Sequence, residues 1–123
     1  MIKFFWIGMG GFFGAIGRYS LSSLMGRWLH EPWFPYGTLA CNILGCFLIG
    51  YLAGMAEYRQ AFPPHIRMLV FVGLLGGFTT FSSFGLETVH LIRESQYIPA
   101  IINITVSVAA GLAAVILGLA LSK

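Results

Sequence analysis

Residues 76–84 have the sequence GGFTTFSSF and lie in the middle of a long apolar stretch. They combine two adjacent glycines with four hydroxyl side chains and three phenylalanines. Glycine costs about 1 kcal/mol relative to alanine in a helix interior, and Ser and Thr offer the backbone competing hydrogen bonds. We therefore expect a helix to be interrupted here. An unbroken but kinked helix, with its hydroxyl groups bonded back to the preceding turn, is the alternative.

The composition of the whole chain indicates that the protein is surrounded by an apolar environment, as in a lipid bilayer. Of 123 residues, 58% are hydrophobic and only 9% are charged, whereas a soluble domain has roughly 25% charged residues. These values argue against a soluble enzyme, a disordered chain and a nucleic-acid binder, despite the net charge of +3. Cys41 and Cys46 are five residues apart, on different faces of the expected helix, so we expect neither a disulfide nor a metal site from them.

Four long stretches carry few or no charges, and each is close to the ~20 residues that an α-helix needs to cross a bilayer. Most charges and prolines lie in the short connections, the first of which contains Glu31 and Pro32. The sequence therefore predicts an all-α membrane protein, with residues 1–123 forming a single four-helix transmembrane domain. The approximate spans are 4–25, 34–56, 68–92 and 98–121.

The orientation of these spans is not fixed by their charges. Four Lys and Arg residues fall on one side of the expected membrane and three on the other, so the usual excess on the cytoplasmic side is nearly absent. Two interpretations remain open. Either a single charge is enough to orient the chain, or both orientations insert and opposed copies pair.

An interruption at mid-membrane is tolerated only where the freed backbone groups face protein, water or an ion. Discontinuous helices are a recurrent way to build ion sites near the bilayer midplane. Phe81 and Phe84 are three residues apart and share a helix face. The edge of a phenyl ring carries the positive part of its quadrupole, so two such edges could attract a small anion; ordinary packing is the simpler interpretation.

Polar residues occur inside the other expected spans as well. Asn42 lies in the second span, and Asn103 and Ser107 lie one turn apart in the fourth. These neutral donors could line an anion path or could bond helices to one another. Arg18 and Glu87 are the ionisable residues set furthest into helices. Arg18 could concentrate anions at an entrance or extend to the headgroups, and Glu87 with His90 could be a proton-linked pair or a solvated helix end.

The sequence contains no recognisable catalytic constellation. It has no HExxH motif, no phosphate-binding loop and no plausible Ser-His-Asp set, so we do not expect an enzyme. It also has no acidic residue in the middle of a span, although proton-coupled exporters generally need a carboxylate there.

Three motifs occur in a fixed order along the chain: Gly17-Arg18-Tyr19, Gly37-Thr38 followed by Asn42 and Gly45, and the stretch 76–84 followed by Glu87. Taken together, these motifs resemble the Fluc (CrcB) family of fluoride channels over essentially the whole chain. Two positions depart from the family pattern. Ser83 stands where Thr is commonest, which keeps a hydroxyl group, and Gly85 stands where Ser is common, which thins the polar lining.

The resemblance implies a dual-topology antiparallel homodimer with two fluoride pathways and a structural sodium ion, Na+, at the dimer interface. It implies vestibule positions for Arg18 and Glu87, and backbone carbonyl ligands for sodium from Gly76 and Thr79. It implies no organic cofactor. The residues that it assigns to the fluoride pathway are Asn42, Phe81, Phe84, Ser82, Ser83 and Ser107.

The leading hypothesis is thus a passive fluoride-selective ion channel that exports fluoride from the cytoplasm and lowers its toxicity. The expected partners are a second copy of the chain, the fluoride ion and the lipid bilayer, and the expected location is a bacterial inner membrane, which the chain crosses several times. The alternative is a proton-coupled exporter of the small multidrug resistance type, which shares the size and four helices but needs a buried glutamate that is missing here. A non-transporting assembly partner is a third hypothesis.

Overall fold

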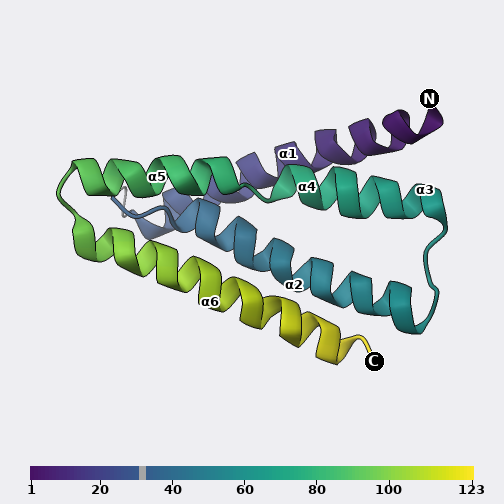
Figure 1. Ribbon diagram of the computed structural model, residues 1–123. Coiled ribbons are helices and arrows are strands. Elements are labelled where there is room, and N and C mark those ends of the chain that lie inside the picture. Colours follow the sequence, from purple (N-terminus) through teal and green to yellow (C-terminus); the bar gives the residue numbers. More distant parts are fainter. Residues whose placement is uncertain (31–32) are drawn as a thin grey trace.

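The computed structural model describes residues 1–30 and 33–123 and is helical over most of that length (Figure 1). No strand occurs among these residues. Glu31 and Pro32, expected in the first connection, lie outside the described residues. The elements are α1 (Ile2–Leu29), α2 (Tyr36–Tyr58), α3 (Pro64–Arg67), the π-helix η1 (Met68–Leu74), α4 (Leu75–Phe78), α5 (Phe81–Arg93) and α6 (Tyr97–Leu121).

Three segments are long and apolar enough to cross a membrane, namely Tyr36–Tyr58, Pro64–Arg93 and Tyr97–Leu121. The helix α1 has 28 residues, which is sufficient length, but it is not among the three. Its many glycines and Arg18 lower its hydropathy. An all-helical membrane protein is therefore confirmed, and the crossing by α1 stays a prediction.

The third segment contains a stretch that the sequence did not predict. Between α3 and α4 the backbone widens into the π-helix η1, while Met68 and Leu75 at its ends keep right-handed helical dihedral angles. The elements α3, η1 and α4 consequently follow one another without a turn. Such π-helical stretches are rare, and no simple residue pattern announces them.

Glycines allow the helices to approach closely, as two of the interfaces show. Where α1 packs on η1, a Cβ atom at Gly10 would lie 2.9 Å from the Cα atom of Gly73. Where α2 packs on α6, a Cβ atom at Gly118 would contact Phe47 O and lie 2.6 Å from Tyr51 N. In lipid, where apolar surface gains little by leaving the solvent, close backbone contact of this kind drives helix association.

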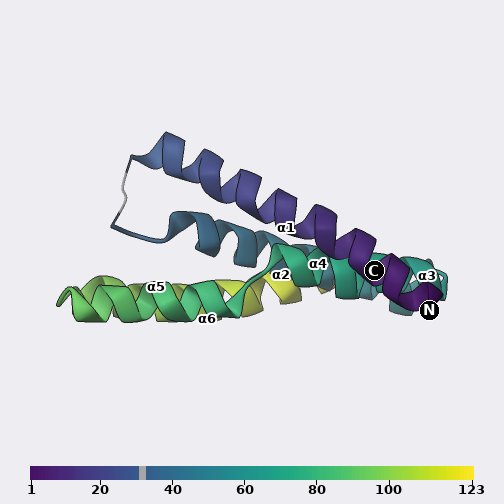
Figure 2. The ribbon, with the colours of Figure 1, turned by 90° about the horizontal axis from the view of Figure 1, so that it is seen from above.

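Most large apolar side chains lie on the outside of the single chain. Among the described residues, the buried apolar side chains are Cys41, Leu75, Leu91 and Ala100, whereas Phe4, Phe12 and Ile98 are all more than half exposed. Figure 2 shows α1 diverging from α5 and α6 as it runs away from the N-terminus. The described chain therefore presents an apolar surface to its surroundings, as a membrane protein does.

Candidate functional site

The third segment is interrupted between α4 and α5. Thr79 and Thr80 have extended backbone, with φ −91° and ψ 153° at Thr79 and φ −149° and ψ 122° at Thr80. The predicted interruption is thus present. It falls within the expected stretch 76–84, at the two threonines, while Gly76 and Gly77 lie within α4 and the helix continues to Phe78.

Hydrogen bonds of Thr79 help to end α4. Its backbone N–H donates to Leu75 O at 3.0 Å, and its hydroxyl group donates to the same oxygen at 2.9 Å. Leu75 O therefore accepts twice, and the second bond holds the Thr79 side chain against the last turn of α4. The chain then leaves the helix at a β-branched residue, which suits extended backbone.

Side chains from two other helices bind the interruption. From α2, Asn42 Nδ2 donates to Thr80 O at 3.0 Å, and Asn42 Oδ1 accepts from Thr80 N at 2.8 Å. From α1, Arg18 Nε donates to Gly77 O at 3.1 Å. Gly77 O and both backbone groups of Thr80 are therefore paired within the chain, as irregular backbone at membrane depth requires of groups that face protein.

A cluster of hydroxyl groups begins α5. The Thr80 side chain caps the helix, accepting from Ser83 N at 3.2 Å, in the manner preferred at helix N-termini. The Thr80 Oγ1 atom also lies 3.3 Å from Ser83 Oγ and 3.2 Å from Ser82 Oγ. The predicted polar residues Ser82 and Ser83 therefore meet Thr80, which is not among the residues expected in the pathway.

The two predicted phenylalanines are neighbours at the start of α5. The ring centroids of Phe81 and Phe84 are 5.5 Å apart and the rings are tilted by 44°. Phe81 is 84% exposed in the single chain. It borders a cavity of about 330 Å³ that is also lined by Asn42, Thr79 and Thr80. The interruption, the Asn42 side chain and the Phe81 ring thus share one cavity.

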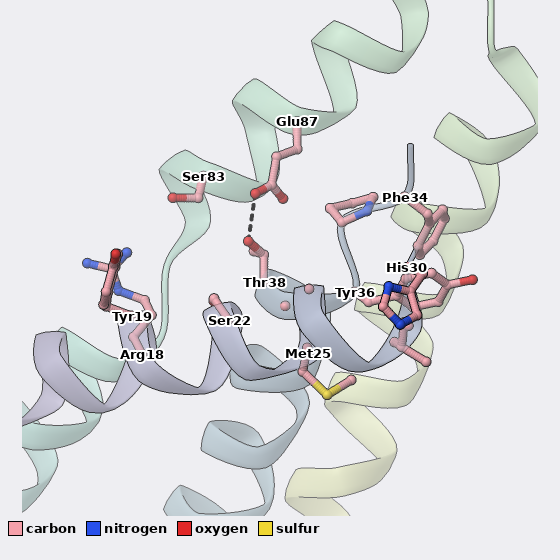
Figure 3. A pocket seen from close by; sticks show the side chains of 14 residues that line it. Arg18, Tyr19, Ser22, Met25, His30, Phe34, Tyr36, Thr38, Ser83 and Glu87 are labelled. Atoms are coloured by element: carbon pink, nitrogen blue, oxygen red, sulfur yellow. Dashed lines mark hydrogen bonds between the residues drawn. The ribbon is translucent and has the colours of Figure 1, made fainter. Parts of the chain in front are cut away.

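A second cavity, of about 500 Å³, lies between α1, α2 and α5 (Figure 3). Arg18, Ser83 and Glu87 all line it. Thr38 and Glu87 point toward one another, and Thr38 Oγ1 donates to Glu87 Oε1 at 2.7 Å. The other carboxylate oxygen, Glu87 Oε2, is buried and has no hydrogen-bond partner among the described residues. The two expected vestibule residues therefore share a cavity, and Thr38 is a contact that sequence spacing did not reveal.

The polar residues of α6 are engaged elsewhere. Asn103 is only 2% exposed and donates to Thr88 Oγ1 at 3.0 Å, and Thr88 in turn donates to Phe84 O at 2.7 Å. Ser107 donates to Asn103 Oδ1 at 3.5 Å. Ser107 lines neither of the two cavities described above. In the single chain, the amide of Asn103 bonds α6 to α5, as the interhelical interpretation of these residues predicts.

The residues suggested for sodium lie at the end of α4. Gly76 is exposed, and a Cβ atom placed there would meet nothing within 4 Å. Gly76 and Thr79 both line the 330 Å³ cavity, and their carbonyl oxygens accept none of the hydrogen bonds described above. Carbonyl oxygens are suitable ligands for a hard cation, so the residues fit such an ion. Within the described ranges, no group of three or more His, Cys, Asp or Glu residues could hold a metal.

These observations define the class of protein: a small integral membrane protein whose third helical segment is discontinuous and hydrogen-bonded to its neighbours. Comparison with known sequences specifies it further. The family described as CrcB-like protein, Camphor Resistance (CrcB), matches residues 5–119. The chain belongs to this family, and the resemblance seen in the motifs is confirmed.

Curated relatives cover nearly the whole chain. It is 42% identical to the fluoride-specific ion channel FluC of Salinibacter ruber over 118 residues, which are 96% of this chain and 87% of that protein. It is 44% identical to FluC of Methylobacillus flagellatus, over 95% of this chain and 91% of that protein. It is 43% identical to FluC of Parabacteroides distasonis, over 100% of this chain and 94% of that protein.

Proposed function

We propose that this protein is a passive, fluoride-selective ion channel that lets fluoride leave the cytoplasm. The observation that carries the proposal is the interruption at Thr79 and Thr80, where Asn42 and Phe81 line the same cavity. Membership of a family whose curated relatives are named fluoride-specific ion channels supports the choice of ion. A channel of this kind performs no covalent chemistry.

The selectivity would come from the way in which the pathway replaces water. Fluoride is small and strongly hydrated, so a narrow path must offer several donors at once and exclude larger anions. Hydroxyl groups of Ser82, Ser83 and Ser107, ring edges of Phe81 and Phe84, and the amide of Asn42 are the proposed lining. None carries a full charge, and neutral groups can bind the ion without retaining it.

The entrance would be the 500 Å³ cavity that contains Arg18 and Glu87. A guanidinium group beside a water-filled cavity raises the local concentration of anions. Glu87 opposes this effect if ionised, and one of its carboxylate oxygens accepts a hydrogen bond from Thr38. Arg18 and Glu87 are therefore proposed as vestibule residues.

The proposed assembly is a homodimer of four-span chains inserted in opposite orientations in the inner membrane of a bacterium, with α1 as the first span. The nearly even distribution of Lys and Arg supports dual topology. The exposed ring of Phe81 and the open side of Gly76 lie on a surface that a second copy could cover. The carbonyl groups of Gly76 and Thr79 would hold a sodium ion, which would supply a fixed positive charge at the dimer interface.

The test is ion flux from liposomes that contain the purified protein. We expect fluoride efflux to exceed chloride efflux by orders of magnitude and to need no pH gradient. Phe81→Ile and Phe84→Ile should each lower fluoride efflux by about tenfold or more, the change expected if ~1.4 kcal/mol is lost at the limiting step. Phe12→Ile, at an exposed position on α1, is the matched control and should conduct normally.

Two results would contradict the proposal. Undiminished fluoride efflux in both α5 variants would remove the phenylalanines from the pathway. Transport that requires a pH gradient and is lost in Glu87→Gln would favour the proton-coupled exporter, for which the unpartnered oxygen of Glu87 is the relevant observation.

A further inference from the structure

Asn42 forms two hydrogen bonds with one residue of the interruption. Its Nδ2 donates to Thr80 O at 3.0 Å and its Oδ1 accepts from Thr80 N at 2.8 Å. We infer that Asn42 is a positioning residue, whose amide holds the Thr80 peptide groups and thereby sets the start of α5. This role is separate from donation to an ion, and it was not assigned from the sequence.

The backbone of Thr80 explains why a single amide can make both bonds. In extended backbone, the N–H and C=O groups of one residue point to the same side, as they do in a hydrogen-bonded pair of antiparallel strands. Thr80 has φ −149° and ψ 122°. The side-chain amide of Asn42 offers a donor and an acceptor side by side. It therefore takes the place of a neighbouring strand.

This pairing also fixes the direction of the amide. Oδ1 must face the Thr80 N–H and Nδ2 must face the Thr80 oxygen. In the reverse arrangement a donor would face a donor and an acceptor would face an acceptor. One N–H of Nδ2 remains uncommitted to Thr80. The two bonds to Thr80 fix the direction of this second N–H, because the Asn42 side chain cannot rotate while they are in place.

The surface of α2 is shaped to receive the interruption. Gly45 lies three residues after Asn42 and is buried, and a Cβ atom there would contact the Thr79 methyl group. A larger residue would push α2 away from Thr79 and lengthen the bonds of Asn42. Asn42 and Gly45 therefore act together, the first by pairing and the second by allowing close approach.

The pairing extends its effect to α5 through Thr80. Thr80 caps α5 by accepting from Ser83 N, and Phe81 is the first residue of that helix. Holding Thr80 consequently orients Phe81 and Ser83. The effect of Asn42 on ion conduction rests on the proposed function, but the pairing itself does not.

The experiment measures hydrogen exchange of the Thr80 amide in the purified full-length protein. In the wild type, we expect slow exchange at Thr80 although its backbone is extended. In the Asn42→Ala variant, the Thr80 amide should exchange at least about tenfold faster, because its acceptor, Asn42 Oδ1, is removed. Cys46→Ser is the matched control, because Cys46 lies one turn further along α2 and lines the same cavity without bonding to Thr80. It should leave the exchange unchanged.

Fluoride efflux, measured on the same preparations, separates positioning from direct donation. Loss of protection together with reduced efflux supports the inference. If Asn42→Ala leaves the exchange at Thr80 unchanged but reduces efflux, the inference is overturned, because Asn42 would then act on the ion alone. An equal loss of Thr80 protection in Cys46→Ser also overturns it, because the cavity would then be loosened in general.

If Asn42→Ala does not fold, the wild-type measurement decides the matter. Exchange at Thr80 as fast as at the connecting residues 60–62 would refute the pairing, and slower exchange would support it. Absence of fluoride efflux in the wild type would reject the proposed function and would leave the exchange result standing.

Discussion

The segment Pro64–Arg93 and the helix α6 are neighbours that share an apolar character and yet differ in continuity. Both are apolar enough to cross a membrane, and both contain polar side chains in their interior. The first is interrupted at Thr79 and Thr80, whereas α6 runs without a break from Tyr97 to Leu121 past Asn103 and Ser107. Polar residues alone are therefore insufficient to break a helix in this protein.

The difference lies in the partners that the backbone finds. In the interrupted segment, Asn42 and Arg18 bond to peptide groups of Thr80 and Gly77. In α6, the polar side chains bond to other side chains, and Asn103 joins Thr88. An interruption thus needs external groups aimed at the main chain. Four substitutions test how the two segments are held.

The largest effect is expected from Gly118→Ala in α6, compared with Gly85→Ala in α5. A Cβ atom at Gly118 would contact the backbone of Phe47 and Tyr51, while one at Gly85 would meet nothing within 4 Å. Gly118→Ala should lower the free energy of unfolding by about 3 kcal/mol. Gly85→Ala should leave it unchanged or raise it by up to ~1 kcal/mol. Reversible denaturation in detergent measures both, and an equal loss in the two variants would refute the packing argument.

A smaller effect is expected from Arg18→Met, which removes the bond to Gly77 O. A hydrogen bond from a charged group contributes about 2 kcal/mol, and the loss should be concentrated at the end of α4. Unfolding and hydrogen exchange around Phe78 measure it, with α6 as the internal reference. If stability and exchange stay the same while fluoride efflux falls, Arg18 acts only through its charge in the vestibule.

The smallest effect is expected from Asn103→Leu. Hydrogen bonds between helices in a membrane contribute about 0.6 kcal/mol on average, and Thr88 keeps its own bond to Phe84 O after the change. The free energy of unfolding should therefore fall by less than ~1 kcal/mol. Hydrogen exchange should show that the amides of α6 stay protected, as in a continuous helix. A loss as large as that of Arg18→Met would show that bonds between side chains matter as much here as bonds to backbone.

The local part of the site could be predicted from sequence because residue chemistry determines it. The hydroxyl-rich stretch after Gly77 indicated an interruption, and the structure has one. Its place within residues 76–84 could not be predicted, because packing determines whether the two glycines stay in the helix. A Cβ atom at Gly77 would lie 2.8 Å from Gly11 O, so Gly77 serves close approach to α1 within a helix and does not break it.

The contacts between distant residues could not be predicted in the same way. Thr38 meets Glu87 across 49 positions of sequence, and Asn42 meets Thr80 across 38. Only the spatial arrangement of the helices selects these pairs from the many polar residues present. The π-helix η1 is equally invisible, since its apolar residues would suit an ordinary α-helix. The assignment of α1 to the membrane also stays a prediction, because its hydropathy is lowered by the same glycines that pack it.

The glycine contact between Gly10 and Gly73 has a mechanical consequence. It fastens α1 to the part of the third segment before Thr79, while Thr88 and Asn103 fasten the part after Thr80 to α6. The two halves of one segment thus belong to different rigid neighbours. A tilt of α1 would carry η1 and α4 with it and leave α5 in place, so that the displacement would fall at the junction between α4 and Thr80, which Asn42 holds.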